Sequence, residues 1–147
     1  MNIKLIMLLI YALLKQHQVP MIEDDVYAEL YFSAKPPRPV KSFDTDGLVM
    51  HCGSFSKCLA PGYRVGWVAA GRFAEQVSRL KLMTTISPSV PAQAALADYL
   101  QHGGYDRHLR KLRHALESQQ RAMLASAARH FPRETRVSRP NGGYFLW

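Results

Sequence analysis

Residues 54–67 read Ser-Phe-Ser-Lys-Cys-Leu-Ala-Pro-Gly-Tyr-Arg-Val-Gly-Trp, and this stretch decides the fold. An apolar run lies directly before it and predicts a buried strand over 48–53 that ends at the first serine. A Pro-Gly pair interrupts the stretch, and the apolar run after it predicts another strand over 65–69. Because the connection between the two strands is short, we expect them to be antiparallel neighbours.

The polar residues of this stretch point to a chemical site. Lys57 has small and apolar neighbours. In such surroundings the charged ammonium is costly to desolvate, so the amine loses its proton easily. A lysine must be deprotonated to form a Schiff base. Arg64 follows seven positions later and can grip a phosphate through two parallel hydrogen bonds. The hydroxyls of Ser54 and Ser56 add phosphate donors. Together they predict a site for a phosphorylated aldehyde, which points to pyridoxal 5′-phosphate (PLP); the weaker alternative is that both cations are surface ions.

A second motif supplies an acidic strand end. The short apolar run 19–22 predicts a buried strand that stops at acidic residues, and a helix is expected before it over 3–16. The helix-then-strand order indicates an α/β fold with a parallel sheet. Ligands of such sheets bind outside the carboxyl ends of the strands. Asp24 and Ser54 both lie at such ends, so we expect Asp24 and Lys57 to share one crevice.

The amino-terminal segment is unusually apolar, with an uninterrupted run at 5–14. Such a run makes about 15 Å of helix, which is too short to cross a bilayer core of about 30 Å. A secretory signal is the weaker alternative, because the residues at 15–18 offer no small-residue cleavage site. We expect a helix that packs against the sheet, and no membrane association.

The rest of the chain alternates helices and breaks. Apolar spacing predicts helices over 73–83, 92–101 and 105–130, and the last is long enough to lead out of a domain. Pro91 suits the first turn of the second of these helices, and the serines before it can cap that helix. The tail 136–147 resembles a hairpin that opens a new small lobe.

Composition narrows the class of protein. The chain has 147 residues, 48% of them hydrophobic and 20% charged, which suits one globular domain with a core. The net charge is +8, and the basic residues are densest in one run. We interpret this run as a solvated helix face or an inter-subunit surface, in preference to a nucleic-acid-binding surface. The run comprises Arg107, Arg110, Lys111, Arg113 and His114, with Arg121 further on.

Cysteine and histidine spacing predicts no metal centre. The six histidines are scattered, and no His/Cys spacing suits a metal ion. Cys52 and Cys58 are too few for a disulfide framework, so we expect buried thiols in a reducing compartment, the cytoplasm.

Three motifs in this order resemble the class I/II aminotransferases, which are fold-type I PLP enzymes. Residues 54–67 are similar to their Schiff-base lysine segment, 22–30 to their acidic strand end and 141–147 to the entry into their small domain. The amino-acid sequence of 54–67 is most similar to the corresponding segment in the MocR subgroup of GntR transcriptional regulators. Those proteins join a winged helix-turn-helix to an aminotransferase-like domain. The resemblance implies a partial PLP-binding large domain over 1–130, including the long interdomain helix, and the start of a small domain over 131–147.

The resemblance also implies roles for individual residues. Lys57 would form the Schiff base with PLP and later act as the base of the 1,3-proton shift. Asp24 would face the pyridine nitrogen and keep it protonated, with Asp25 as the rival carboxylate. Tyr27 would donate a hydrogen bond to the phenolic oxygen of the cofactor, the alternative being a packed aromatic residue.

The phosphate of PLP would be bound by Ser54, Ser56 and Arg64. Cys58 stands where relatives usually carry threonine, which we interpret as a harmless exchange of small residues. Other family elements are not found among the 147 residues: the glycine-rich phosphate turn, the aromatic residue stacked on the ring, the asparagine beside the phenolic oxygen, the carboxylate-binding arginine and the winged helix. We therefore expect a fragment, inactive in isolation and weak in holding PLP.

Two functions fit these motifs. The favoured one is a PLP-binding aminotransferase-like domain from a MocR/GntR-type regulator, with DNA bound only through a module outside these residues. The alternative is part of an amino-acid aminotransferase of aminoadipate or aromatic type, which transfers an amino group between an α-amino acid and a 2-oxo acid. Either would take a small α-amino acid or amine as ligand and form a homodimer.

Overall fold

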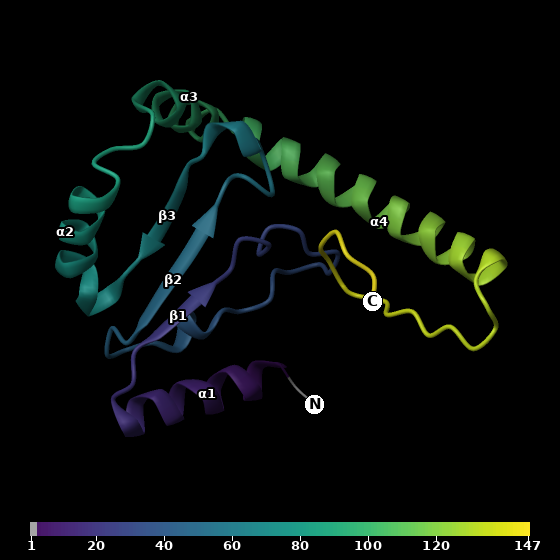
Figure 1. The fold of residues 1–147 in the computed structure, drawn as a ribbon, viewed down its shortest axis with the longest axis horizontal. Coiled ribbons are helices and arrows are strands. Elements are labelled where there is room, and N and C mark those ends of the chain that lie inside the picture. Colours follow the sequence, from purple (N-terminus) through teal and green to yellow (C-terminus); the bar gives the residue numbers. More distant parts are fainter. Residues whose placement is uncertain (1–2) are drawn as a thin grey trace.

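The computed structural model describes residues 3–147, which form a small mixed sheet with helices around it (Figure 1). The regular elements are α1 (Ile3–His17), β1 (Met21–Asp24), β2 (Val49–Ser54), β3 (Gly66–Ala69), α2 (Ala74–Thr84), α3 (Val90–Gln101) and α4 (Gly104–His130). Three short 3-10 turns connect them: η1 (Val40–Phe43), η2 (Pro61–Tyr63) and η3 (Gly71–Phe73). Each helix and strand predicted before residue 131 is present, with ends shifted by at most two residues. The predicted α/β class is confirmed.

The sheet has the order β1-β2-β3, with β1 parallel and β3 antiparallel to β2. Asp24 is registered with Cys52, and Ser54 with Gly66. The carboxyl ends of β1 and β2 therefore lie side by side, as the strand-end argument predicted. The antiparallel partnership of β2 and β3 is confirmed as well.

Helix α1 packs on one face of the sheet and closes the first of two small cores. Its buried centre consists of Tyr11, Val40 and Val49. Side chains around them include Met7, Ile10, Leu14, Met21 and Phe43. The apolar amino-terminal run is thus a sheet-packing helix, as predicted. Among the described residues, no helix has the length and hydropathy needed to cross a membrane.

A second core joins α4 to the stretch that follows β2. Leu30, Cys58, Leu109 and Leu116 are buried in it. Leu109 and Leu116 lie two turns apart on one stripe of α4, the spacing that gives an amphipathic helix its buried face. The interpretation of the basic run as a solvated face is right for most of its members but wrong for Arg113, whose Nη2 lies 2.8 Å from Glu29 Oε2.

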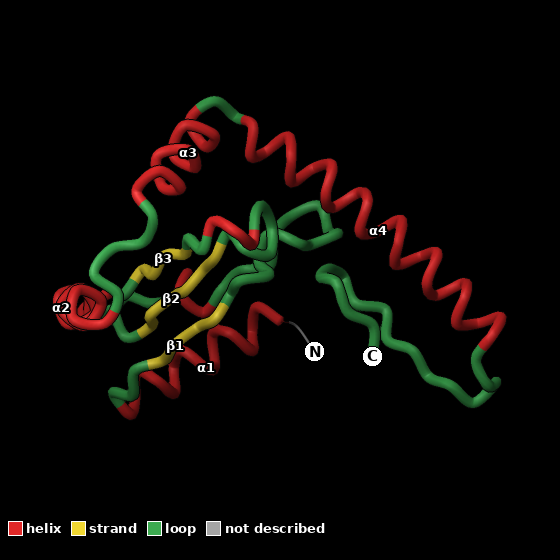
Figure 2. Tube along the Cα trace, turned by 45° about the horizontal axis from the view of Figure 1, so that its top comes forward, coloured by secondary structure: helices red, strands yellow, loops and turns green. Residues whose placement is uncertain are grey.

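The segment after α4 differs from the hairpin that the sequence predicts. The ends of this segment meet where the Ser138 amide donates to the Trp147 carbonyl, but no strand forms over 136–147. Instead the chain turns back beside α4 and makes one antiparallel bridge between Gly142 and Tyr31 (Figures 1 and 2). The tail therefore packs on the chain segment that follows β1.

The capping prediction at α3 is also corrected. Ser89 occupies the N-cap position and Pro91 the first turn, as expected, but the Ser89 side chain makes no capping hydrogen bond.

Candidate functional site

The predicted lysine segment forms a tight turn at the carboxyl end of β2. The Ser54 hydroxyl accepts a hydrogen bond from the Ser56 amide at 3.1 Å, which starts the turn. The amides of Leu59 and Ala60 then both donate to the Phe55 carbonyl, at 2.9 and 3.0 Å. Lys57 lies in the middle of this turn and is exposed.

Arg64 returns to the same turn from the other side of η2. Its Nη1 donates to the Ser56 hydroxyl at 3.2 Å. Its backbone is left-handed, with φ 52°, a conformation that costs a residue other than glycine about 1 kcal/mol or more. Strain of this kind is often kept where it serves a site. Ser54, Ser56 and Arg64, predicted together as phosphate donors, are thus neighbours in the structure.

Tyr27 and Lys57 face each other across a pocket. Lys57 Nζ lies 6.0 Å from the centroid of the Tyr27 ring. Tyr27 in turn packs edge-to-face on Tyr144 and Phe145, with centroids 6.3 and 6.1 Å away. The pocket measures about 400 Å³, and its lining also includes Ser56, Cys58, Leu59, Pro61, His108 and Leu112. Tyr27 is thus both a packed aromatic residue and a neighbour of the lysine.

The two candidate carboxylates have different surroundings. Asp24 is exposed at the end of β1 and accepts a long hydrogen bond, 3.4 Å, from the Val26 amide. Asp25 is paired with His51, its Oδ2 lying 3.1 Å from His51 Nε2. Burial, and secondarily the charge of Asp24, raises the pKa of the Cys52 thiol. Asp24 therefore presents an available carboxylate beside β2, whereas Asp25 already has a cationic or hydrogen-bonding partner.

Two expectations from the sequence are not met. Lys57 and Arg64 are exposed, so the described residues do not supply the desolvation that was expected around the lysine. Asp24 does not line the pocket that Lys57 and Tyr27 share. Asp24 is exposed among residues 3–147, whereas α4 and the tail contact the lysine turn through Cys58 and the Lys57 carbonyl.

The prediction of buried thiols is confirmed for one of the two cysteines. Both cysteines are free; Cys58 is buried, whereas Cys52 is half-buried. In the described part of the chain no cluster of histidine, cysteine and carboxylate groups could hold a metal ion.

Three residues at the lysine turn were missed by sequence reasoning. His108 Nε2 donates to the Cys58 carbonyl at 2.8 Å, and the Tyr105 hydroxyl lies 3.2 Å from Cys58 Sγ. The Tyr144 hydroxyl donates to the Lys57 carbonyl. All three lie at least 47 residues further along the chain, and no motif marks them.

The residues present fit PLP. A primary amine, an aromatic hydroxyl and a carboxylate surround the strand ends, and three phosphate donors converge in one turn beside them. No carboxylate of residues 3–147 pairs with Arg64, so its guanidinium remains able to bind an anion.

Known proteins share the sequence family and the fold of this chain. Residues 7–147 match the family described as aminotransferase class I and II. The chain belongs to this family. Its aminotransferase-like α/β fold is shared with solved structures. One is the multiple substrate aminotransferase of Thermococcus profundus, with a TM-score of 0.87 and 31% identity over 97% of this chain and 36% of that one. Another is the α-aminoadipate aminotransferase LysN of Thermus thermophilus, with a TM-score of 0.88 and 28% identity over 96% and 37%.

Similar curated sequences are HTH-type transcriptional regulators. The regulator YdcR of Escherichia coli is 50% identical over 136 residues, which is 92% of this chain and 29% of the relative. The regulator NorG of Staphylococcus aureus is 34% identical over 134 residues, which is 90% and 30%. The chain thus spans less than a third of the length of these relatives. PLP is the cofactor that this family and these structures imply in general.

Proposed function

We propose that this chain is the lysine-bearing part of a PLP-binding, aminotransferase-like domain in a MocR/GntR-type transcriptional regulator. The observation that carries the proposal is the turn at the end of β2, where Ser54, Ser56 and Arg64 gather beside Lys57. The regulator assignment is supported by the 50% identity to an HTH-type regulator. By the same proposal, residues 1–130 belong to the large domain and 131–147 begin the small one.

Each residue has a distinct role in this proposal. Lys57 Nζ would hold the aldehyde carbon of PLP, with loss of the carbonyl oxygen as water, and would move a proton to or from the bound ligand. Ser54, Ser56 and Arg64 hold the phosphate through hydrogen bonds that are strengthened by charge. When bound, PLP supplies an electron sink that accepts carbanion charge. Asp24 would hold a proton on the pyridine nitrogen, and Tyr27 would donate its hydroxyl proton to the ring oxygen.

The test is reductive trapping. The protein is incubated with PLP and reduced with borohydride, and the modified lysine is located by mass spectrometry. We expect Lys57 to carry the phosphopyridoxyl group, and labelling to be suppressed by inorganic phosphate because the phosphate site is shared. Lys81→Ala, on the exposed side of α2, serves as the matched control and should leave trapping unchanged.

Lys57→Ala should abolish the phosphate-sensitive adduct. An adduct that persisted in this variant, with the same sensitivity to phosphate, would show that another lysine holds the cofactor. Arg64→Ala should weaken the competition by phosphate more than it weakens reaction of the amine.

A second candidate function is amino transfer between an α-amino acid and a 2-oxo acid. It is favoured by the TM-scores of 0.87 and 0.88 to aminotransferases. The two candidates are separated in the full-length protein: sequence-specific DNA binding that changes with PLP or an amine supports the regulator, and sustained exchange of amino groups supports the enzyme. A small α-amino acid or amine ligand, a homodimer and a cytoplasmic location are parts of the same proposal.

A further inference from the structure

The backbone at Lys57 receives side-chain hydrogen bonds from two distant segments. His108, on α4, reaches the Cys58 carbonyl with Nε2 at 2.8 Å. Tyr144, in the carboxyl-terminal loop, donates to the Lys57 carbonyl. Because a carbonyl oxygen can only accept, His108 Nε2 must carry a proton, which fixes its role as a donor. Two consecutive carbonyls of the lysine turn are therefore held from outside the turn.

The same turn of α4 also holds the side chain that follows the lysine. Cys58 is 3% exposed, and its Sγ lies 3.2 Å from the Tyr105 hydroxyl. Tyr105 and His108 are three residues apart and therefore lie on one face of α4. Tyr105 further packs edge-to-face on Phe55, with centroids 5.9 Å apart. One turn of α4 thus contacts three parts of the lysine turn: the Cys58 carbonyl, the Cys58 thiol and the Phe55 ring.

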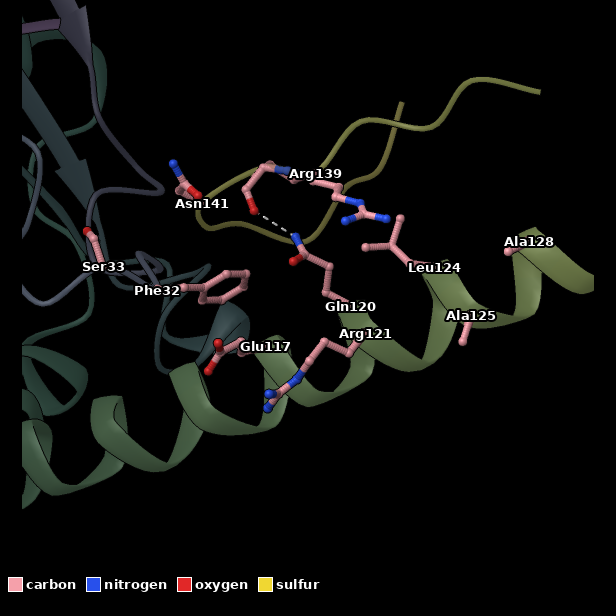
Figure 3. A pocket seen from close by; sticks show the side chains of 11 residues that line it. Phe32, Ser33, Glu117, Gln120, Arg121, Leu124, Ala125, Ala128, Arg139 and Asn141 are labelled. Atoms are coloured by element: carbon pink, nitrogen blue, oxygen red, sulfur yellow. Dashed lines mark hydrogen bonds between the residues drawn. The ribbon is translucent and has the colours of Figure 1, made fainter. Parts of the chain in front are cut away.

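Tyr144 is fixed by its own anchors. Gln120 Nε2, on α4, donates to the Pro140 carbonyl at 2.9 Å, and this bond spans the pocket drawn in Figure 3. The Gly143 amide donates to the Leu30 carbonyl at 2.8 Å, so the loop is also tied to the chain after β1. Burial raises the pKa of the Tyr144 phenol, and the nearby Cys58 and Tyr27 raise it further, so the hydroxyl keeps its proton at neutral pH.

We propose that His108 and Tyr144 are positioning residues for Lys57, which fix the backbone of the lysine turn while its ammonium group stays open to the pocket. The proposal rests on the proposed function in that Lys57 is taken as the reacting amine. Its physical content is independent of PLP: each hydrogen bond closes a turn that would otherwise open more often. A net bond of about 1 kcal/mol corresponds to about a fivefold change in the open population.

The first experiment measures opening of the turn without PLP. Alkylation of the buried Cys58 thiol is followed by mass spectrometry, with the half-buried Cys52 as internal reference, together with hydrogen exchange of the amides at 57–60. His108→Leu should raise the Cys58 rate and the local exchange about fivefold. His108→Gln retains an N–H donor and should restore both. His114→Leu, on the exposed side of α4, is the matched control and should change neither.

Tyr144→Phe tests the second bond in the same assay. It should accelerate exchange at Lys57 and Cys58, and Tyr99→Phe is its control because Tyr99 lies on α3. Equal alkylation rates in His108→Leu and His114→Leu would overturn the role of His108. A parallel rise at Cys52 and Cys58 would also overturn the proposal, since it indicates general loss of stability and not local opening.

The second experiment connects positioning to the amine. Borohydride trapping of PLP at Lys57 should be slower in His108→Leu and recover in His108→Gln, with phosphate competition unchanged. Unchanged trapping in His108→Leu, despite an open turn, would overturn the positioning role. If the wild type traps no PLP at Lys57, the proposed function fails, while the alkylation experiment still decides whether His108 and Tyr144 hold the turn.

Discussion

The two ends of β2 carry similar polar residues but use them in opposite ways. At the amino-terminal end, the Asp44 side chain is fully buried and accepts hydrogen bonds from the Leu48 and Val49 amides at 3.0 Å each. Lys41 Nζ lies 2.9 Å from the same carboxylate and donates to the Val49 carbonyl at 2.7 Å. The Tyr11 hydroxyl adds a bond to Asp46 at 2.8 Å. The polar side chains at this end therefore form their hydrogen bonds with other groups of the chain.

At the carboxyl-terminal end, the cations are exposed. Lys57 is exposed, and the Arg64 side chain donates to the Ser56 hydroxyl at 3.2 Å from a left-handed backbone. The anchors at this end hold the backbone, through His108 and Tyr144, and leave the ammonium and guanidinium groups available. The difference teaches that a lysine or arginine satisfied within the fold serves stability, whereas one that stays available beside a fixed backbone suits a ligand.

The largest effect is expected at the amino-terminal end. Asp44→Ala removes the acceptor of two buried amides and of the Lys41 ammonium, so it should lower the free energy of unfolding by about 3 kcal/mol or more. Urea unfolding followed by circular dichroism measures this change. Asp98→Ala, on the exposed side of α3, is the control and should stay within about 0.5 kcal/mol. A small effect of Asp44→Ala would break the contrast between the two ends.

The same carboxylate predicts a pH dependence. Burial by itself would raise the pKa of Asp44, but the hydrogen bonds from Lys41, Val49 and Leu48 outweigh it and leave the pKa lowered. Its stabilising contribution is therefore fully present above the pKa of the unfolded chain, about 3.9, and is lost as the pH falls through the lower folded value. The urea concentration at the unfolding midpoint should decrease as the pH is lowered below about 4. The decrease should be less steep in Asp44→Asn. Equal slopes in both proteins would contradict the assignment.

A smaller effect is expected for the hydroxyl that ties α1 to this end. Tyr11→Phe removes the bonds to the Asp46 carboxylate and the Thr45 amide while keeping the ring in the core. The free energy of unfolding should fall by about 1 kcal/mol. Tyr99→Phe provides the matched loss of a hydroxyl on α3, and comparable destabilisation by both variants would argue against a special role for Tyr11.

The smallest change in stability is expected at the carboxyl-terminal end, and with the opposite sign. Arg64→Gly relieves the left-handed backbone and should raise the free energy of unfolding by about 0.5 kcal/mol. It should at the same time weaken phosphate-sensitive trapping of PLP, because the guanidinium is gone. Destabilisation together with unchanged trapping would make Arg64 a structural residue and erase the difference between the ends.

Much of this architecture was predictable, because it depends on local patterns. The apolar run at 5–14 identified α1, and the run before Ser54 identified β2. The short connection through Pro61 gave the antiparallel partner. Ser54, Ser56 and Arg64 were also predictable as neighbours, since fewer than a dozen residues separate them and a strand end fixes their turn.

Other features depended on contacts that no local pattern encodes. The Ser89 hydroxyl does not cap α3 although its residue type and position favour a cap, because capping needs a side-chain orientation as well as a residue. The tail bridges Tyr31 through Gly142, where a Cβ would overlap the Leu30 carbonyl oxygen, so its course is set by close packing on a distant segment.

The sequence by itself determined the order of the elements, the family and the candidate residues for a phosphorylated aldehyde, because hydrophobic periodicity and motif sequence are local properties of the chain. The tertiary structure alone decided that Lys57 is exposed, that Asp25 is taken by His51, and that His108 and Tyr144 hold the lysine turn. These contacts join residues that are 26 to 87 positions apart in the sequence. The packing of the strands, α4 and the tail against one another determines them.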